Sequence, residues 1–226
     1  MPLHSTHPDI VVFDCETTGL EPLIDRVIEL AAIRYRWNHN AYEPVDKYNP
    51  LLRFEGVLAP RIVEITGITD RLLKESGIVE AAVAIEFANR FLTGFQRPPL
   101  FVAYNAAFDI GFLRQLLARN GKAFPENADY LDLLTVYRDR AAYPHKLGDA
   151  LEHYQLSGTV QNTHRAIDDC QATFALLEAM SAEEDDLKSY LNLFGYNPNY
   201  AIKHRIPGII YRPQPFRSRT KLYLAK

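Results

Sequence analysis

A short apolar run near the N-terminus ends in two acidic residues. Residues 10–13 are all β-branched or aromatic, which is typical of a strand buried on both faces of a sheet. The run continues through Asp14 and Glu16 and stops at a turn signal in residues 17–19. Side chains at positions i and i+2 of a strand point to one face, so the two carboxylates project together. Two such charges require either a cation between them or contact with water at the strand end.

The pattern of apolar residues predicts the remaining elements. Residues 27–37 and 51–54 have strand composition, and the hairpin-length gaps favour an antiparallel start to the sheet. Residues 100–104 predict a further buried strand. Apolar residues recur at helical spacing in four segments, 79–95, 108–121, 147–154 and 167–177. This order of elements predicts a mixed sheet covered by helices, in an α/β fold.

Charge is distributed unevenly over the 226 residues. All 28 Asp and Glu lie in residues 1–186 beside 17 Lys and Arg, which gives this part a charge of −11. The last 40 residues hold the other 8 Lys and Arg and no acid, a charge of +8. The length suits one sizeable domain with an extension. A basic extension of this kind indicates a contact with a polyanion or with the acidic body itself.

The basic extension begins with a predicted helix. Ser181 and Glu184 form a capping box, Gly195 suits the C′ position, and apolar residues between them share one face that docks on the body. Beyond it, cations and rings alternate: Lys203, Arg205, Arg212, Arg217, Arg219, Lys221 and Lys226, with Tyr200, Tyr211, Phe216 and Tyr223. Such a segment suits single-stranded nucleic acid, and it equally suits an intramolecular strap.

Two further acidic residues, Asp109 and Asp169, lie near the starts of predicted helices. Asp109 lies in the first turn of the helix after strand 100–104, where either an ordinary helix-start acid or a site at the sheet edge is expected. His164 and Asp169 are five residues apart, about 140° around a continuous helix. They converge more easily if His164 lies on the loop before the helix.

Three segments together resemble the motifs of the DEDDh 3′–5′ exonucleases, the DnaQ-like family that includes the proofreading epsilon subunit of bacterial DNA polymerase III. Residues 13–20 (FDCETTGL) are similar to the first motif and residues 105–112 (NAAFDIGF) to the second. His164-x-Ala166-x-x-Asp169 is similar to the third, and Arg165 stands where a tyrosine-type relative would carry Tyr. The match spans residues 9–180.

The resemblance implies a fold and a domain organisation. The expected fold is a ribonuclease H-like mixed five-stranded sheet flanked by helices, with a basic C-terminal extension. Residues 1–181 would form the exonuclease domain, and residues 182–226 a C-terminal helix and basic tail of unknown role.

The resemblance also implies site residues. Asp14, Glu16, Asp109 and Asp169 become ligands of two Mg²⁺ or Mn²⁺ ions, about 3.5–4 Å apart in two-metal sites. His164 becomes the general base, since an imidazole with a pKa near 6.5 accepts a proton around neutral pH. These five residues form the expected catalytic set, and the neighbouring Asp168 is interpreted as a solvated helix acid.

Substrate contacts are expected in the turn after the first strand. By the resemblance, Thr17, Thr18, Gly19 and Leu20 hold the 3′-terminal nucleotide, with Gly19 allowing close backbone approach and Leu20 wedging against the terminal base. Phe108 resembles an aromatic residue beside the substrate, although a role in the core is an equal alternative.

The function implied is hydrolysis of DNA from the 3′ end to nucleoside 5′-monophosphates, in proofreading or repair. Expected partners are nucleic acid with a free 3′ end, single-stranded DNA above all, and a DNA polymerase subunit. A 3′–5′ exoribonuclease and a catalytically silent nucleic-acid- or polymerase-binding module are the alternatives. The absence of a GxGxxG or P-loop sequence argues against a dinucleotide oxidoreductase or a kinase. Without a secretory signal or a long apolar run, a cytoplasmic protein with no membrane partner is expected.

Overall fold

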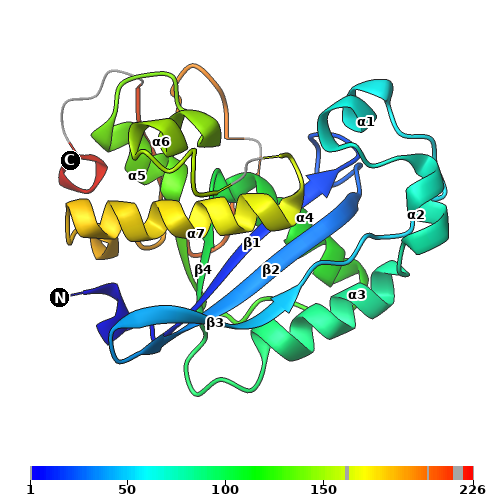
Figure 1. The fold of residues 1–226 in the computed structure, drawn as a ribbon, viewed down its shortest axis with the longest axis horizontal. Coiled ribbons are helices and arrows are strands. Elements are labelled where there is room, and N and C mark those ends of the chain that lie inside the picture. Colours follow the sequence, from blue (N-terminus) through cyan, green and yellow to red (C-terminus); the bar gives the residue numbers. More distant parts are fainter. Residues whose placement is uncertain (1, 161–162, 203, 216–220, 226) are drawn as a thin grey trace.

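A five-stranded mixed sheet forms the centre of the computed structural model, which describes residues 2–160, 163–202, 204–215 and 221–225 (Figure 1). The strand order is β3-β2-β1-β4-β5. The first three strands pair antiparallel, whereas β1–β4 and β4–β5 pair parallel. The strand bounds are β1 Asp9–Thr17, β2 Val27–Asn38, β3 Ala41–Tyr48, β4 Leu100–Ala103 and β5 Asp129–Asp132.

Helices cover both faces of this sheet. Their bounds are α1 Pro60–Thr66, α2 Asp70–Ser76, α3 Glu80–Phe87, α4 Ala106–Arg119, α5 Leu133–Arg140, α6 Leu147–His153 and α7 Ala166–Glu183. A π-helical turn, η2 Ala88–Leu92, continues α3, and 3₁₀ turns occur at η1 Leu3–Ser5, η3 Leu187–Tyr190 and η4 Leu222–Leu224. Among the described residues, none of these helices is long and apolar enough to cross a membrane.

The central strand β1 supplies side chains to two separate cores. Val11, Phe13 and Cys15 pack with α3 and α4. Ile10 and Val12 pack with α5, α6 and α7 on the other face. Figure 1 shows α7 crossing over β1 and β2. Because side chains alternate along a strand, this pattern directs the next even-numbered residues, Asp14 and Glu16, toward α7.

The predicted third strand at residues 51–54 is wrong. The third strand is β3, and Leu51 and Leu52 form only isolated bridges, to Glu29 and Ile78. The reason is that β3 is an edge strand whose residues are half-buried or exposed, so it lacks an apolar run. Strand β5 and helices α1, α2 and α5, which the apolar pattern did not predict, complete the fold.

The predicted C-terminal helix over residues 181–195 is also wrong. Helix α7 runs through Ser181 to Glu183, and the chain then forms η3 and a strand, β6 Leu193–Tyr196. β6 pairs in parallel with β7 Ile210–Pro213. Between η3 and β6, Asn192 has a positive φ of 56°, which ends any helix, and its backbone N–H donates to the carbonyl oxygen of Tyr130 in β5. Leu187, Tyr190 and Phe194 are buried as expected, but they lie on a 3₁₀ turn and a strand instead of one α-helix.

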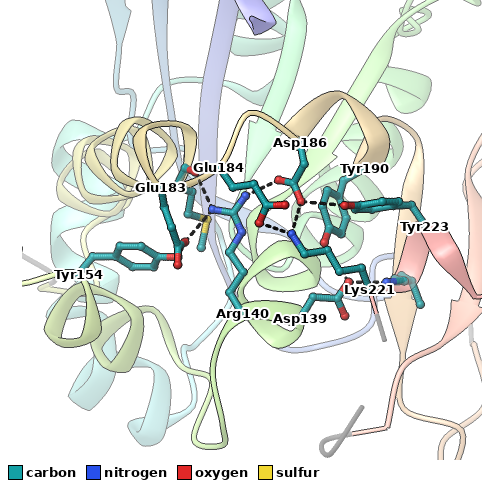
Figure 2. Close-up of polar contacts among 11 residues, drawn as sticks. Asp139, Arg140, Tyr154, Glu183, Glu184, Asp186, Tyr190, Lys221 and Tyr223 are labelled. Atoms are coloured by element: carbon teal, nitrogen blue, oxygen red, sulfur yellow. Dashed lines mark hydrogen bonds and ion pairs between the residues drawn. The ribbon is translucent and has the colours of Figure 1, made fainter. Parts of the chain in front are cut away.

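The end of the described chain is attached to α5 and to the segment that follows α7 by a network that we call the C-terminal clamp, made of Asp139, Arg140, Asp186, Lys221 and Tyr223 (Figure 2). The Arg140 guanidinium donates to Asp186 Oδ1 (2.5 Å), and Lys221 Nζ donates to Asp186 Oδ2 (2.6 Å). Burial acts to raise the pKa of Asp186, but the hydrogen bond from Lys221 and the charge of Arg140 lower it overall. Tyr223 Oη also donates to Asp186, and Asp139 accepts from the backbone N–H of Leu222.

The clamp assigns Lys221 to an intramolecular contact. Arg212 likewise donates to the carbonyl oxygens of Leu222 and Ala225. Five residues of the predicted cation–aromatic pattern lie outside the described residues: Lys203, Phe216, Arg217, Arg219 and Lys226.

Candidate active site

Three carboxylates converge where β1 meets the start of α7. Asp14 and Glu16 project from the α7 side of β1, and Asp169 lies in the first turn of α7. One carboxylate oxygen from each residue lies within 4.8 Å of the other two. Asp169 is buried, and Asp14 and Glu16 are half-buried. The shared-face geometry expected from the sequence therefore brings these two acids to a third from the opposite end of the chain.

Asp109 lies on the other side of β1, in the first turn of α4. It is buried, and its Oδ1 accepts a hydrogen bond from the backbone N–H of Cys15 (3.0 Å). Burial raises the pKa of Asp109 well above its usual range, with the charge of Asp14 as the next cause. Asp109 thus lies beside Asp14 without belonging to the group of three.

Burial and repulsion between neighbouring acids raise the pKa of all three carboxyls, Asp14, Glu16 and Asp169. Burial, followed by the charges of Asp169 and Glu29, raises the pKa of Asp14 well above its usual range. Burial and then the charge of Asp14 raise the pKa of Glu16 to about 9. Burial and then the charge of Asp168 raise the pKa of Asp169 to about 7. Clustered, partly dehydrated carboxylate oxygens are the donor set that hard divalent cations prefer, so these residues fit Mg²⁺ or Mn²⁺.

An ion pair between the buried Glu29 and Arg165 holds the segment between His164 and Asp169. Glu29 of β2 is fully buried opposite Glu16, and its carboxylate accepts from Arg165 Nη2 (2.6 Å) and Nε (3.0 Å). The same carboxylate accepts from the backbone N–H of Ala166 at 3.2 Å. Glu29 is not among the site residues expected from the sequence, although a single acid within the apolar run of residues 27–33 is the signal that points to it.

His164 lies on the loop two residues before α7. Its side chain is exposed and its φ is +54°. In the described part of the chain, it is not a member of the group of ligand atoms within 4.8 Å of one another. Asp168, in the first turn of α7, is half-buried and accepts a hydrogen bond from Thr163 Oγ1 (2.5 Å), so its carboxylate joins the start of the helix to the loop before it.

The turn after β1 is closed by its own hydrogen bonds. Thr17 Oγ1 donates to the carbonyl oxygen of Gly19 (2.6 Å), and Thr18 Oγ1 donates to Asp25 Oδ1 (3.1 Å). A Cβ at Gly19 would lie 2.5 Å from a carboxylate oxygen of Asp25, so a larger residue there would have to displace the Asp25 carboxylate that binds Thr18. Leu20 is 77% exposed at the end of the turn.

Phe108 lies at the margin of the core and also lines a pocket, so it has contacts that suit both the core role and the substrate role expected from the sequence. Its ring packs against Phe112, with centroids 4.9 Å apart, at the margin of the core. It also lines, with Leu20, a pocket of about 330 Å³. Leu20 and Phe108 therefore line one pocket together.

The raised pKa values predict how pH and metal change stability. A carboxyl whose pKa is higher in the folded than in the unfolded state stabilises the fold at low pH, and this contribution is lost as pH rises through the folded value. For metal-free protein we therefore expect the melting temperature to fall as pH rises through about 7 for Asp169 and toward about 9 for Glu16.

Divalent metal should reverse this loss. Mn²⁺ at about 100 times its dissociation constant adds about 2.7 kcal/mol, or roughly 5–10 °C for a chain of this size. Thermal unfolding at pH 6 and 8.5, with EDTA or with Mn²⁺, measures both effects. Asp14→Asn is the control and should flatten the pH dependence. A melting temperature that changes with neither Mn²⁺ nor pH would contradict the interpretation of these acids as a metal site.

Comparison with known proteins gives a family match and related sequences. The family model RNase_T, described as Exonuclease, matches residues 11–177. The PolC-type DNA polymerase III of Halalkalibacterium halodurans is 34% identical over 185 residues, which cover 79% of this chain and 12% of the relative. The PolC-type enzyme of Bacillus subtilis is 32% identical over 174 residues, 75% of this chain and 11% of the relative. The chain therefore spans about an eighth of the length of these relatives.

Solved structures share the fold. Exonuclease I of E. coli in complex with a dA16 oligonucleotide superposes with a TM-score of 0.67 at 23% identity, covering 81% of this chain and 43% of that one. The apo form of Exonuclease I gives a TM-score of 0.67 at 22% identity, covering 82% and 44%. This similarity confirms the ribonuclease H-like mixed sheet flanked by helices.

Proposed function

This chain belongs to the RNase_T exonuclease family, and from that premise we propose that it is a metal-dependent 3′–5′ exonuclease of DNA. It would remove nucleoside 5′-monophosphates from a free 3′ end, in proofreading or repair. The observation that carries the proposal is the group formed by Asp14, Glu16 and Asp169, whose ligand oxygens lie within 4.8 Å of one another. A binding module without catalysis has no need of three mutually repelling, partly buried acids.

Substrate and partner are supported by the named relatives. Both polymerase relatives are DNA polymerases, and the superposed Exonuclease I is in complex with a DNA oligonucleotide. We therefore propose single-stranded DNA with a free 3′ end as substrate and a DNA polymerase subunit as partner.

Each residue of the site has a proposed task. Asp14, Glu16 and Asp169 would hold two Mg²⁺ or Mn²⁺ ions, with Asp109 beside Asp14. When bound, the ions would stabilise charge on the scissile phosphate and acidify the attacking water.

His164 would accept the proton of the attacking water as general base. Its exposed loop position gives the imidazole access to solvent and substrate, while the Glu29–Arg165 pair fixes the backbone immediately after it. The turn of residues 17–20 would receive the terminal nucleotide, with the exposed Leu20 side chain against its base.

Time courses on end-labelled substrates test this function. Single-stranded DNA, duplex DNA and RNA, each labelled at the 5′ end, are incubated with the chain and Mg²⁺, Mn²⁺ or EDTA. We expect a ladder of products shortened from the 3′ end on single-stranded DNA, which EDTA and Asp14→Asn abolish. Immediate release of the labelled 5′ nucleotide would contradict the polarity, and faster shortening of RNA would favour the exoribonuclease. No metal-dependent shortening of any substrate would refute the enzyme.

A further inference from the structure

The C-terminal extension forms one wall of the pocket that Leu20, in the turn proposed to receive the terminal nucleotide, also lines. Leu20 and Phe108 lie on the wall provided by the exonuclease fold, and Tyr196, Tyr200 and His204 lie on the wall provided by the extension. Tyr200 is 72% exposed. All three extension residues lie outside the part of the chain that matches the family model, so family membership assigns this wall no role.

A second pocket, of about 360 Å³, continues the first. Pro22 and His204 line both pockets, and Arg114 of α4 and Arg205 of the extension line the second. The Arg205 guanidinium lies 5.4 Å from the centroid of the Tyr211 ring, which lines the first pocket. Aromatic rings therefore lie next to Leu20 and Phe108, and two guanidinium-bearing side chains lie in the adjoining pocket.

We propose that these two pockets form a binding track for the nucleotides that precede the 3′-terminal nucleotide of single-stranded DNA. The inference rests on the proposed exonuclease function and adds a subsite to it. Rings on which bases stack, followed by cations that contact phosphates, are the chemistry that holds a single strand without regard to sequence. Tyr200 would stack on a base, and Arg205 would contact the backbone farther from the cleaved end.

The extension is anchored on both sides of the track. Before it, Asn192 joins β5 through the Tyr130 carbonyl oxygen and joins β7 by accepting from Ile210 N–H (2.8 Å). After it, the C-terminal clamp holds Lys221 and Tyr223 against Asp186 (Figure 2). Within the loop, Tyr211 Oη accepts from the backbone N–H of Ile206. A wall fixed before the ligand arrives loses little entropy on binding.

The described cations of the extension therefore have different tasks. Lys221 and Arg212 bind the chain itself, which is the strap expected as one alternative from the sequence. Arg205 contacts the Tyr211 ring at the track, which is the nucleic-acid contact expected as the other. The intramolecular strap and the nucleic-acid contact therefore involve different residues of the C-terminal extension.

Binding measurements without cleavage test the track directly. The full chain with Asp14→Asn is titrated into a 5′-fluorescein-labelled dT12, and anisotropy gives the dissociation constant. Adding Tyr200→Ala should weaken binding about tenfold, the size of one lost stacking contact. Adding Arg205→Ala should reduce the slope of log K against log salt by about 0.7. Tyr143→Ala, which removes a 69% exposed tyrosine that lines neither pocket, should change nothing.

Hydrolysis assays distinguish a failure of the binding track from a failure of the proposed exonuclease function. With Asp14 intact, Tyr200→Ala should raise KM for dT12 about tenfold and leave kcat unchanged. The p-nitrophenyl ester of thymidine 5′-monophosphate occupies only the terminal site and should be cleaved at the unaltered rate. Unchanged dT12 binding in Tyr200→Ala and Arg205→Ala, or equal effects on dT12 and the ester, would overturn the track. If the unaltered chain cleaves neither substrate, the exonuclease proposal fails, and the anisotropy result still decides whether the track exists.

Discussion

Asp169→Asn is expected to lower metal-dependent hydrolysis by about 10³-fold or more, whereas Asp168→Asn should retain most of the activity. Metal ions contribute several kcal/mol to transition-state charge stabilisation, and each 1.36 kcal/mol is a factor of ten in rate. Asp169 is buried and within 4.8 Å of Asp14 and Glu16, while Asp168 is half-buried and bonded to Thr163. The two variants change adjacent acids in the same helical turn, so they are closely matched controls for each other.

Stability distinguishes a lost ligand from a damaged fold. In metal-free protein Asp169→Asn removes one of three repelling charges, so its melting temperature at pH 8 should equal or exceed that of the unaltered chain. Isothermal titration with Mn²⁺ should show weaker binding for Asp169→Asn and nearly normal binding for Asp168→Asn. The reverse ranking in activity and Mn²⁺ affinity would assign the ligand role to Asp168 instead.

Local patterns predicted the elements whose signal lies within one segment. The alternation along β1 places Asp14 and Glu16 on one face, and α7 starts after His164 as the loop interpretation required. These features depend on the strand period and on residues close in sequence. The exonuclease family model and the PolC-type DNA polymerase III relatives agree with the resemblance drawn from the three motifs.

Features that depend on distant contacts could not be predicted in this way. The spacing of Leu187, Tyr190 and Phe194 fits a helix, but the chain turns at Asn192 to bond with Tyr130 on β5, and a buried strand follows. Similarly, β3 has no apolar run because it lies at the sheet edge. In both cases tertiary pairing determined the backbone conformation, and the apolar pattern determined only which residues are buried.

The Glu29–Arg165 pair joins residues 136 positions apart, and its structure predicts an asymmetric response to mutation. Glu29 is completely buried, whereas the Arg165 side chain is 40% exposed. Arg165→Met leaves a buried carboxylate without its cation, so we expect a loss of about 3–5 kcal/mol in the free energy of unfolding. Glu29→Gln leaves Arg165 unpaired, but water can reach this cation. The amide oxygen of the new glutamine can still accept from Ala166 N–H, so we expect a smaller loss of about 1–3 kcal/mol.

Chemical denaturation measures these losses. In Arg165→Met the loss comes from a buried carboxylate left without its cation, so removing that carboxylate should offset it. Adding Glu29→Gln should restore part of the stability. Arg36→Met is the control: Arg36 of β2 pairs with Asp9 of β1 but is 53% exposed, so its loss should not exceed about 1 kcal/mol.

Activity shows whether the pair also positions the site. Arg165 lies between His164 and Asp169, and Glu29 also binds Ala166 N–H, so loosening the pair should displace both functional side chains. Groups that orient metal ligands typically contribute 10–100-fold to activity or metal affinity. We expect a fall of that size in kcat for Arg165→Met, assayed below its unfolding transition, with only partial rescue by Arg165→Lys because one ammonium cannot replace a planar fork. If Arg165→Met lowers the free energy of unfolding but keeps normal kcat and Mn²⁺ affinity, the pair is purely structural. If Arg165→Met and Arg36→Met lower the free energy of unfolding equally, the burial of Glu29 has no energetic consequence.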